Sequence, residues 1–112
     1  MTVQELISAL ELKVFHLAQP ERLVTGGYVG DLLSWVMGRA GQDSAWLTIM
    51  SNQNVAAVAL MADVACVILT EGVQPDADLL RRAEEKEVNL LGIGADTFAA
   101  ACQLGQVLSV PQ

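Results

Sequence analysis

The sequence predicts a three-layer α/β fold, in which helices cover both faces of a mostly parallel sheet of four to five strands. Three runs rich in apolar residues carry this prediction, at residues 45–50, 64–69 and 88–93. Such runs are typical of strands that are covered on both faces. Segments with helical spacing of apolar residues alternate with these runs, and the connectors are only a few residues long. This alternation favours right-handed crossovers between parallel strands.

Helical spacing predicts five helices, over residues 2–10, 31–37, 55–61, 76–87 and 97–104. Strands are expected at residues 13–17, 45–50, 64–69 and 88–93, with a further short edge strand at 107–110. Thr2 followed by Glu5 matches a capping box at the start of the first helix. Asn52 or Asn54 is expected to cap the third helix and Asp96 the last. Residues 22–27 are expected to form a turn or an extended connector.

Length and charge restrict the class of protein. The chain of 112 residues fits one domain, residues 1–112. A net charge of −7 with only six Lys and Arg argues against nucleic-acid binding and against anionic membranes. The sequence shows neither a secretory signal nor an apolar run long enough to cross a bilayer, so we expect a cytoplasmic protein.

The two cysteines, Cys66 and Cys102, both fall in apolar segments. We expect both to be small buried residues in a reducing compartment. A disulfide, a metal pair and a redox couple are the alternative interpretations.

The glycine-rich segment around Thr25, Gly26 and Gly27 is the leading candidate for a binding site. Clustered glycines indicate a positive φ or a group that approaches the main chain closely. In open α/β sheets, ligands bind beyond the carboxyl ends of the strands. That rule selects four loops, at residues 25–27, 51–54, 70–72 and 94–96. The candidate ligand or partner residues are Thr25, Gly26, Gly27, Asn52, Gln53 and Glu71. The alternative is that these residues only form turns and caps.

Catalytic patterns are absent from the sequence. It has no P-loop lysine motif and no dinucleotide fingerprint, and its single histidine, His16, falls in a predicted strand. We therefore predict no catalytic residue, no metal site and no cofactor. Trp35 and Trp46 are each expected to lie in the core or at a partner surface. Trp35 and Met37 are the candidate residues for the interface of a homodimer.

Residues 24–37, which include the Thr25-Gly26-Gly27 segment, closely resemble the DRTGG domain family. The resemblance continues through residues 46–49, 53–59, 67–69 and 90–92. That family is similar to the N-terminal domain of bacterial HPr serine kinase/phosphorylases. The resemblance implies an α/β fold shared with the N-terminal domains of Mur ligases such as MurF, and a bacterial or archaeal cytoplasmic protein. Leu23 and Val24 stand where the family has Asp-Arg, and Arg22 lies one position early. The P-loop kinase domain is missing, so kinase activity is not implied.

Two functions follow as hypotheses. The first is a non-catalytic regulatory or protein-interaction module, expected to be a homodimer, that stands apart from the kinase, CBS or phosphatase domains usually fused to it. It would present its polar loops to a small anionic ligand or a partner protein. The alternative is a small subunit of a multi-protein redox (hydrogenase-like) or phosphotransfer enzyme, which would act with a partner chain. Glu71, Asp96 and Thr25 would then be the polar groups that share one edge.

Overall fold

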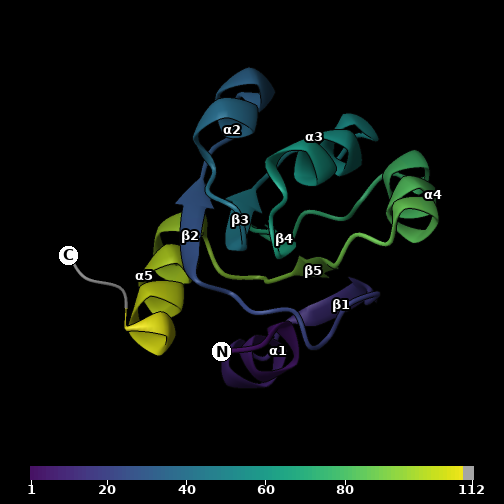
Figure 1. Cartoon of the computed structure of the whole chain (residues 1–112). Coiled ribbons are helices and arrows are strands. Elements are labelled where there is room, and N and C mark those ends of the chain that lie inside the picture. Colours follow the sequence, from purple (N-terminus) through teal and green to yellow (C-terminus); the bar gives the residue numbers. More distant parts are fainter. Residues whose placement is uncertain (110–112) are drawn as a thin grey trace.

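The computed structural model describes residues 1–109, which form an α/β fold with five helices and one five-stranded sheet (Figure 1). The helices are α1 (Val3–Leu10), α2 (Leu33–Arg39), α3 (Asn54–Ala62), α4 (Ala77–Lys86) and α5 (Thr97–Leu108). The strands are β1 (Lys13–His16), β2 (Gly26–Val29), β3 (Ser44–Thr48), β4 (Cys66–Leu69) and β5 (Leu90–Gly92). The predicted fold class, a mostly parallel sheet between helices, is confirmed.

The order of strands in the sheet is β1-β5-β4-β3-β2. Strands β2 to β5 are parallel, and β1 pairs antiparallel with β5, with Lys13 opposite Gly92. The prediction that residues 22–27 form only a connector is wrong, because Gly26 and Gly27 open β2. This segment is extended because it pairs with β3 along four consecutive residues. The first parallel strand is therefore β2, and the earlier strand β1 closes the opposite edge.

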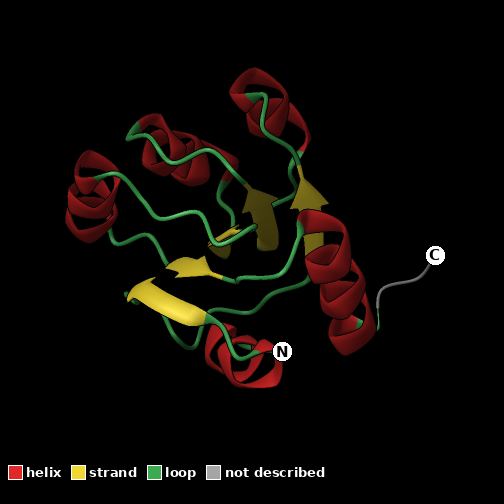
Figure 2. Ribbon diagram, turned by 180° about the vertical axis from the view of Figure 1, so that it is seen from behind, coloured by secondary structure: helices red, strands yellow, loops and turns green. Residues whose placement is uncertain are grey.

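The helices form two layers (Figure 1). Three successive crossovers each lead to the neighbouring strand in the same direction, and α2, α3 and α4 therefore lie on one face of the sheet. Helices α1 and α5 cover the other face, as the view from behind also shows (Figure 2). Each layer has its own core. Trp46, Val67, Leu69 and Leu79 belong to the first core, and Leu6, Leu47, Ile68, Leu91 and Leu104 to the second.

The helix ends agree with the sequence signals in part. Thr2 and Glu5 form the predicted capping box, and Asp96 accepts a hydrogen bond of 2.8 Å from the backbone nitrogen of Ala99. Asn52, one of the two predicted caps of α3, does cap this helix, because its Oδ1 accepts a hydrogen bond of 2.9 Å from the backbone nitrogen of Asn54. Gln53 stands directly before the helix but makes no capping hydrogen bond with its side chain. The expected edge strand at residues 107–110 is wrong, because α5 continues through Leu108 and packs its last turn on the second core. Position 110 lies outside the described residues.

The cysteines and tryptophans divide between core and surface. Cys66 is fully buried as predicted, but the prediction for Cys102 is wrong, because this side chain is exposed on α5. Trp46 is fully buried, and its Nε1 donates a hydrogen bond of 2.8 Å to the carbonyl of Gly30. Trp35 is 53% exposed, with the Arg39 guanidinium 3.9 Å from its ring centroid. Among residues 1–109, no helix is both long enough and apolar enough to span a membrane.

Candidate functional site

The carboxyl ends of the four parallel strands lie at one edge of the sheet, and the loops that follow them gather there. Three of the four predicted loops, at residues 51–54, 70–72 and 94–96, belong to this edge. Strand β1 runs in the opposite direction, so its first residue, Lys13, lies at the same edge beside Gly92. The edge therefore combines strand ends from β2 to β5 with the start of β1.

The fourth predicted loop, Thr25-Gly26-Gly27, lies at the opposite edge. Gly26 is paired with Ser44, the first residue of β3, and marks the amino end of the parallel strands. The prediction of one common rim is therefore wrong for these three residues. Neither glycine has a positive φ. Gly27 instead allows Leu104 of α5 to approach closely, because a Cβ there would lie 2.7 Å from Cδ2 of Leu104.

Arg22 organises this amino edge. Its Nη2 atom lies 2.9 Å from Oδ1 of Asp43 and 2.7 Å from Oδ1 of Asp63, and it also donates to the Asp63 carbonyl. The hydrogen bond and the charge of Arg22 lower the pKa of Asp63 below its usual value. Arg22 is thus committed to two carboxylates and ties the β1–β2 connection to the turns before β3 and β4. This arrangement is a structural clamp and leaves little of the guanidinium for a ligand.

Glu71 lies at the carboxyl edge, and its carboxylate caps α5. Oε2 accepts hydrogen bonds from the backbone nitrogen of Thr97 at 2.9 Å and from its Oγ1 at 3.2 Å. Oγ1 of buried Thr70 lies 2.6 Å from the same hydroxyl. The N-terminus of a helix attracts negative charge. Glu71 already supplies that charge, so this helix end is occupied by the protein itself.

The other predicted site residues are spread over separate places. Oδ1 of Asn52 accepts a hydrogen bond of 2.9 Å from the backbone nitrogen of Asn54. Gln53 lines a separate groove between α3 and α4, beside Arg82 and Lys86. Asn52, Gln53 and Glu71 thus share an edge, but their contacts differ.

The predicted interface residues Trp35 and Met37 are exposed by 53% and 43%. They lie one position on either side of the buried Val36 in α2 and therefore project from opposite flanks of the helix. Their part in a dimer interface stays a prediction.

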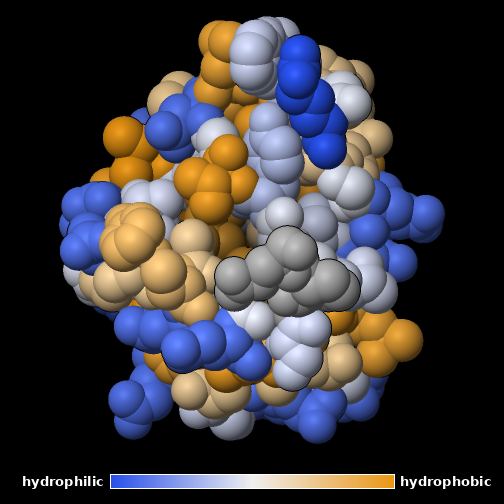
Figure 3. Space-filling view, turned by 90° about the vertical axis from the view of Figure 1, so that its left-hand side faces the viewer, coloured by the Kyte–Doolittle hydropathy of each residue, from blue (hydrophilic) through white to orange (hydrophobic). Residues whose placement is uncertain are grey.

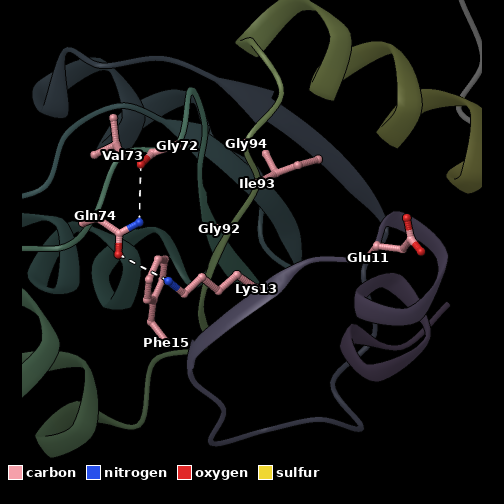
Figure 4. Close-up of a pocket in the computed structure, with 9 residues that line it drawn as sticks. All are labelled: Glu11, Lys13, Phe15, Gly72, Val73, Gln74, Gly92, Ile93 and Gly94. Atoms are coloured by element: carbon pink, nitrogen blue, oxygen red, sulfur yellow. Dashed lines mark hydrogen bonds between the residues drawn. The ribbon is translucent and has the colours of Figure 1, made fainter.

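A pocket of about 220 Å³ opens at the carboxyl edge where β4 and β5 send their chains to opposite faces (Figure 4). Strand β4 leads to α4 on one face, and β5 leads to α5 on the other. Such a divergence leaves a crevice beyond the strand ends, which is the usual place for ligands in α/β sheets. The backbone of Gly72, Gly92 and Gly94 forms part of its wall.

Phe15 and Gly92 form the floor of this pocket. A Cβ on Gly92 would lie only 2.6 Å from Cε2 of Phe15, so the ring rests directly on the backbone of β5. Gly72 turns the wall of the pocket with a φ of 71°, a conformation that glycine adopts without strain. The pocket thus has one aromatic side chain set against a glycine backbone.

Lys13 provides the positive charge of the pocket. Its Nζ lies 5.1 Å from the centroid of the Phe15 ring and 3.5 Å from Oε1 of Gln74. Nε2 of Gln74 donates in turn to the carbonyl of Gly72 at 3.4 Å. Within residues 1–109, no carboxylate oxygen lies within 4.0 Å of this ammonium. Glu11 lines the pocket but lies away from Lys13 (Figure 4).

These groups can bind but offer little chemistry. An ammonium beside an aromatic ring and an amide suits an anion that also carries a flat apolar part. The described part of the chain holds no group of three His, Cys, Asp or Glu residues that could bind a metal ion.

Sequence reasoning missed Lys13, Phe15 and Gln74. The carboxyl-end rule looks only after strands, whereas Lys13 and Phe15 start a strand that runs the other way. The antiparallel pairing of β1 with β5 could not be inferred from residue patterns.

Comparison with known proteins agrees with this architecture. The model of the DRTGG domain family matches residues 5–107. The crystal structure of the CBS and DRTGG domains of the regulatory region of Clostridium perfringens pyrophosphatase, complexed with the activator diadenosine tetraphosphate, has a similar fold. The TM-score is 0.71 at 13% identity, and the likeness covers 98% of this chain and 47% of that chain, so this chain spans about half the length of its structural relative. No curated protein sequence matches. Because the family model covers nearly all of its residues, this chain belongs to the DRTGG domain family.

Proposed function

We propose that this chain is a non-catalytic regulatory module that binds a small anionic ligand in the pocket between β1, β5 and the β4–α4 loop. The observation that carries the proposal is the Lys13 ammonium, which lies beside the Phe15 ring without a carboxylate partner among the described residues. Membership of the DRTGG family supports the regulatory role. The structural relative is a regulatory region that was crystallised with a nucleotide activator, which supports a phosphorylated ligand.

The chemistry of the pocket favours a nucleoside phosphate. A phosphate group would accept a charge-assisted hydrogen bond from Lys13 Nζ. A base would find the face or edge of Phe15 and the amide of Gln74 within the same pocket. A volume of about 220 Å³ lies below the range of about 300–1,000 Å³ that is usual for small-molecule sites, so the pocket would enclose only part of a nucleotide. Since the net charge of the chain is −7, the attraction for an anion depends on this local cation.

The test is a thermal-shift series with AMP, ADP, ATP, diadenosine tetraphosphate and inorganic pyrophosphate. A ligand that binds the folded chain raises Tm progressively with its concentration. We expect at least one nucleotide to do so with the wild type and none with Lys13→Gln. Lys86→Gln is the matched control, because it removes the same charge from the only other lysine, which lies in the groove between α3 and α4.

The outcomes separate the parts of the proposal. A wild-type chain that responds to no nucleotide and not to pyrophosphate contradicts ligand binding. A response that survives Lys13→Gln but disappears in Lys86→Gln assigns the ligand to the groove between α3 and α4 and overturns the proposed site. Phe15→Leu should weaken nucleotide binding and leave any pyrophosphate response unchanged. If chromatography shows that the chain converts the bound nucleotide into a product, the non-catalytic role is contradicted.

A further inference from the structure

Helix α5 has no charged side chain among its 12 residues. Helix α3 shares this property, but its exposed Leu60 and Met61 line a groove together with Arg82 and Lys86 of α4. Helix α4, by contrast, carries two arginines and several acids along its 10 residues. The first turn of α5 also presents Phe98, whose side chain is 80% exposed. A large aromatic side chain at that exposure, on an uncharged helix, indicates a surface that is covered by a partner.

The edge strand beside α5, β2, also carries no charged side chain. Strand β2 is the last strand of the sheet, so its outer side has no partner strand among the described residues. Its sequence, Gly26-Gly27-Tyr28-Val29, has no charge, no proline and no bulge. The opposite edge strand, β1, has Lys13 and an irregular register between Val14 and His16. Charges and bulges are the usual means by which an edge strand avoids pairing. Strand β2 lacks them.

The space between β2 and α5 is a shallow apolar groove of about 200 Å³, lined by Gly27, Val29, Ala101 and Gly105 among others. Val29 is 49% exposed beside it. The molecule viewed from this side shows apolar and weakly polar residues at and above the middle of the face, with hydrophilic residues around them and below the middle (Figure 3).

The exposed side of α5 carries both a projection and a hollow. Phe98, Ala101, Cys102 and Gly105 recur at intervals of three and four residues and therefore line one side of the helix. The small side chains after Phe98 leave a depression of about 390 Å³. A two-fold axis beside the helix would place the Phe98 ring of each copy over the small residues of the other. The surface is therefore self-complementary, as a two-fold interface requires.

The self-complementary shape favours a second copy of this chain as the partner, and the absence of charge on this face permits it. Two copies with a net charge of −7 each repel one another, and they approach at least cost through a face without charged side chains. Neither β2 nor α5 contains a charged residue. We propose that two copies associate through β2 and α5, with the β2 edges paired antiparallel into one continuous sheet and the two α5 helices packed antiparallel beneath them.

This arrangement satisfies both elements at once. Helix α5 packs against β2, and Leu104 lies on Gly27. Pairing the β2 edges about a two-fold axis therefore brings the two α5 helices side by side on the same face of the joined sheet. The free N–H and C=O groups of β2 become hydrogen-bonded, and Phe98 becomes buried. The pocket at Lys13 lies at the other end of the strand order, so the dimer leaves it open.

The test is the molar mass in solution, measured by light scattering over a dilution series. The wild type should show twice the chain mass of 11.9 kDa and fall to one chain on dilution. Phe98→Glu and Val29→Lys should each halve the mass at concentrations where the wild type is dimeric. Both side chains are exposed in one copy, so neither change should prevent folding, and circular dichroism checks this. The control is Met61→Glu, a change of the same kind at a residue of α3 that is 70% exposed and outside the proposed interface.

Thiol labelling locates the interface independently. Burial raises the pKa of Cys66 to about 12, so only Cys102 should react in the folded chain. Cys102 should be labelled slowly in the concentrated wild type and quickly after dilution or in Phe98→Glu. A monomeric wild type at every concentration overturns the proposal. A dimer that survives both interface changes, or that dissociates only in Met61→Glu, overturns it as well. Concentration-independent labelling of Cys102 in a proven dimer would also place the interface elsewhere.

Discussion

A methyl group added at Gly92 tests how the floor of the pocket is built. A Cβ at this position would lie 2.6 Å from Cε2 and 3.0 Å from Cζ of Phe15, whereas ordinary contacts begin at 3.4 Å. The carbonyl of Leu69 lies 3.7 Å from the same point and limits any shift of β5 in that direction. The ring of Phe15 must therefore move away from the sheet and into the pocket. Overpacking of this kind destabilises a fold by about 1–3 kcal/mol.

Urea unfolding followed by tryptophan fluorescence measures this loss, because Trp46 is fully buried in the folded chain. In thermal unfolding, the same loss should lower the Tm of Gly92→Ala by roughly 4–12 °C for a domain of this length. Gly38→Ala is the matched control. Gly38 lies in α2 with nothing within 4 Å of an added Cβ, so alanine there should stabilise the helix by about 0.5–1 kcal/mol.

Two results would refute this reasoning. Wild-type stability in Gly92→Ala would contradict the described floor, because it would mean that Phe15 does not rest on the backbone of β5. A similar loss in both variants would show that the effect is not a local clash. Because the displaced ring enters the pocket, Gly92→Ala should also weaken the nucleotide response proposed above.

Three further predictions concern the framework. Asn89→Ala should cost about 2–4 kcal/mol in urea unfolding, because this buried side chain makes four hydrogen bonds to backbone groups. Wild-type stability in Asn89→Ala would contradict a stabilising role for these hydrogen bonds. Asp63→Asn should reduce stability at neutral pH. The lowered pKa of Asp63, set by Arg22, stabilises the fold above the ordinary value of about 3.9, and the benefit is lost as the pH falls through the lowered pKa. Thermal unfolding should therefore show wild type and variant converging in acid, and a constant difference at all pH values would be the contrary result. Asp96→Ala should cost about 1 kcal/mol by removing the cap of α5, measured by the same urea titration, and an unchanged midpoint would contradict it.

Most of the fold could be predicted because three strands are apolar on both faces. The runs at residues 45–50, 64–69 and 88–93 contain β3, β4 and β5, and their short length between turn residues favours covered strands over buried helices. Strand β2 was missed because its first two residues are glycines, which are depleted in strands and common in turns. Its extended conformation depends on pairing with β3 and on the approach of Leu104, both of which come from distant parts of the chain.

For the candidate site, the sequence could predict only that it lies at the carboxyl ends of the parallel strands. The carboxyl-end rule selected Glu71 and its neighbours, and the pocket lies beside them. The rule could not select Lys13 and Phe15, since their place depends on the antiparallel strand that the sequence pattern does not distinguish from a parallel one. The two explanations offered for the glycines were a positive φ and a close approach, and at Gly27 it is the close approach of α5 that the structure shows.

The most direct test of the ligand pocket is a titration of the ¹⁵N-labelled chain with a nucleotide, read as amide chemical-shift changes. The account predicts that the amides of Gly72, Gly92 and Gly94 shift first and most, and that those of Gly26 and Gly27 at the far edge of the sheet stay in place. Shifts that gather at Gly26 and Gly27, or a spectrum that does not change at saturating nucleotide, would contradict it.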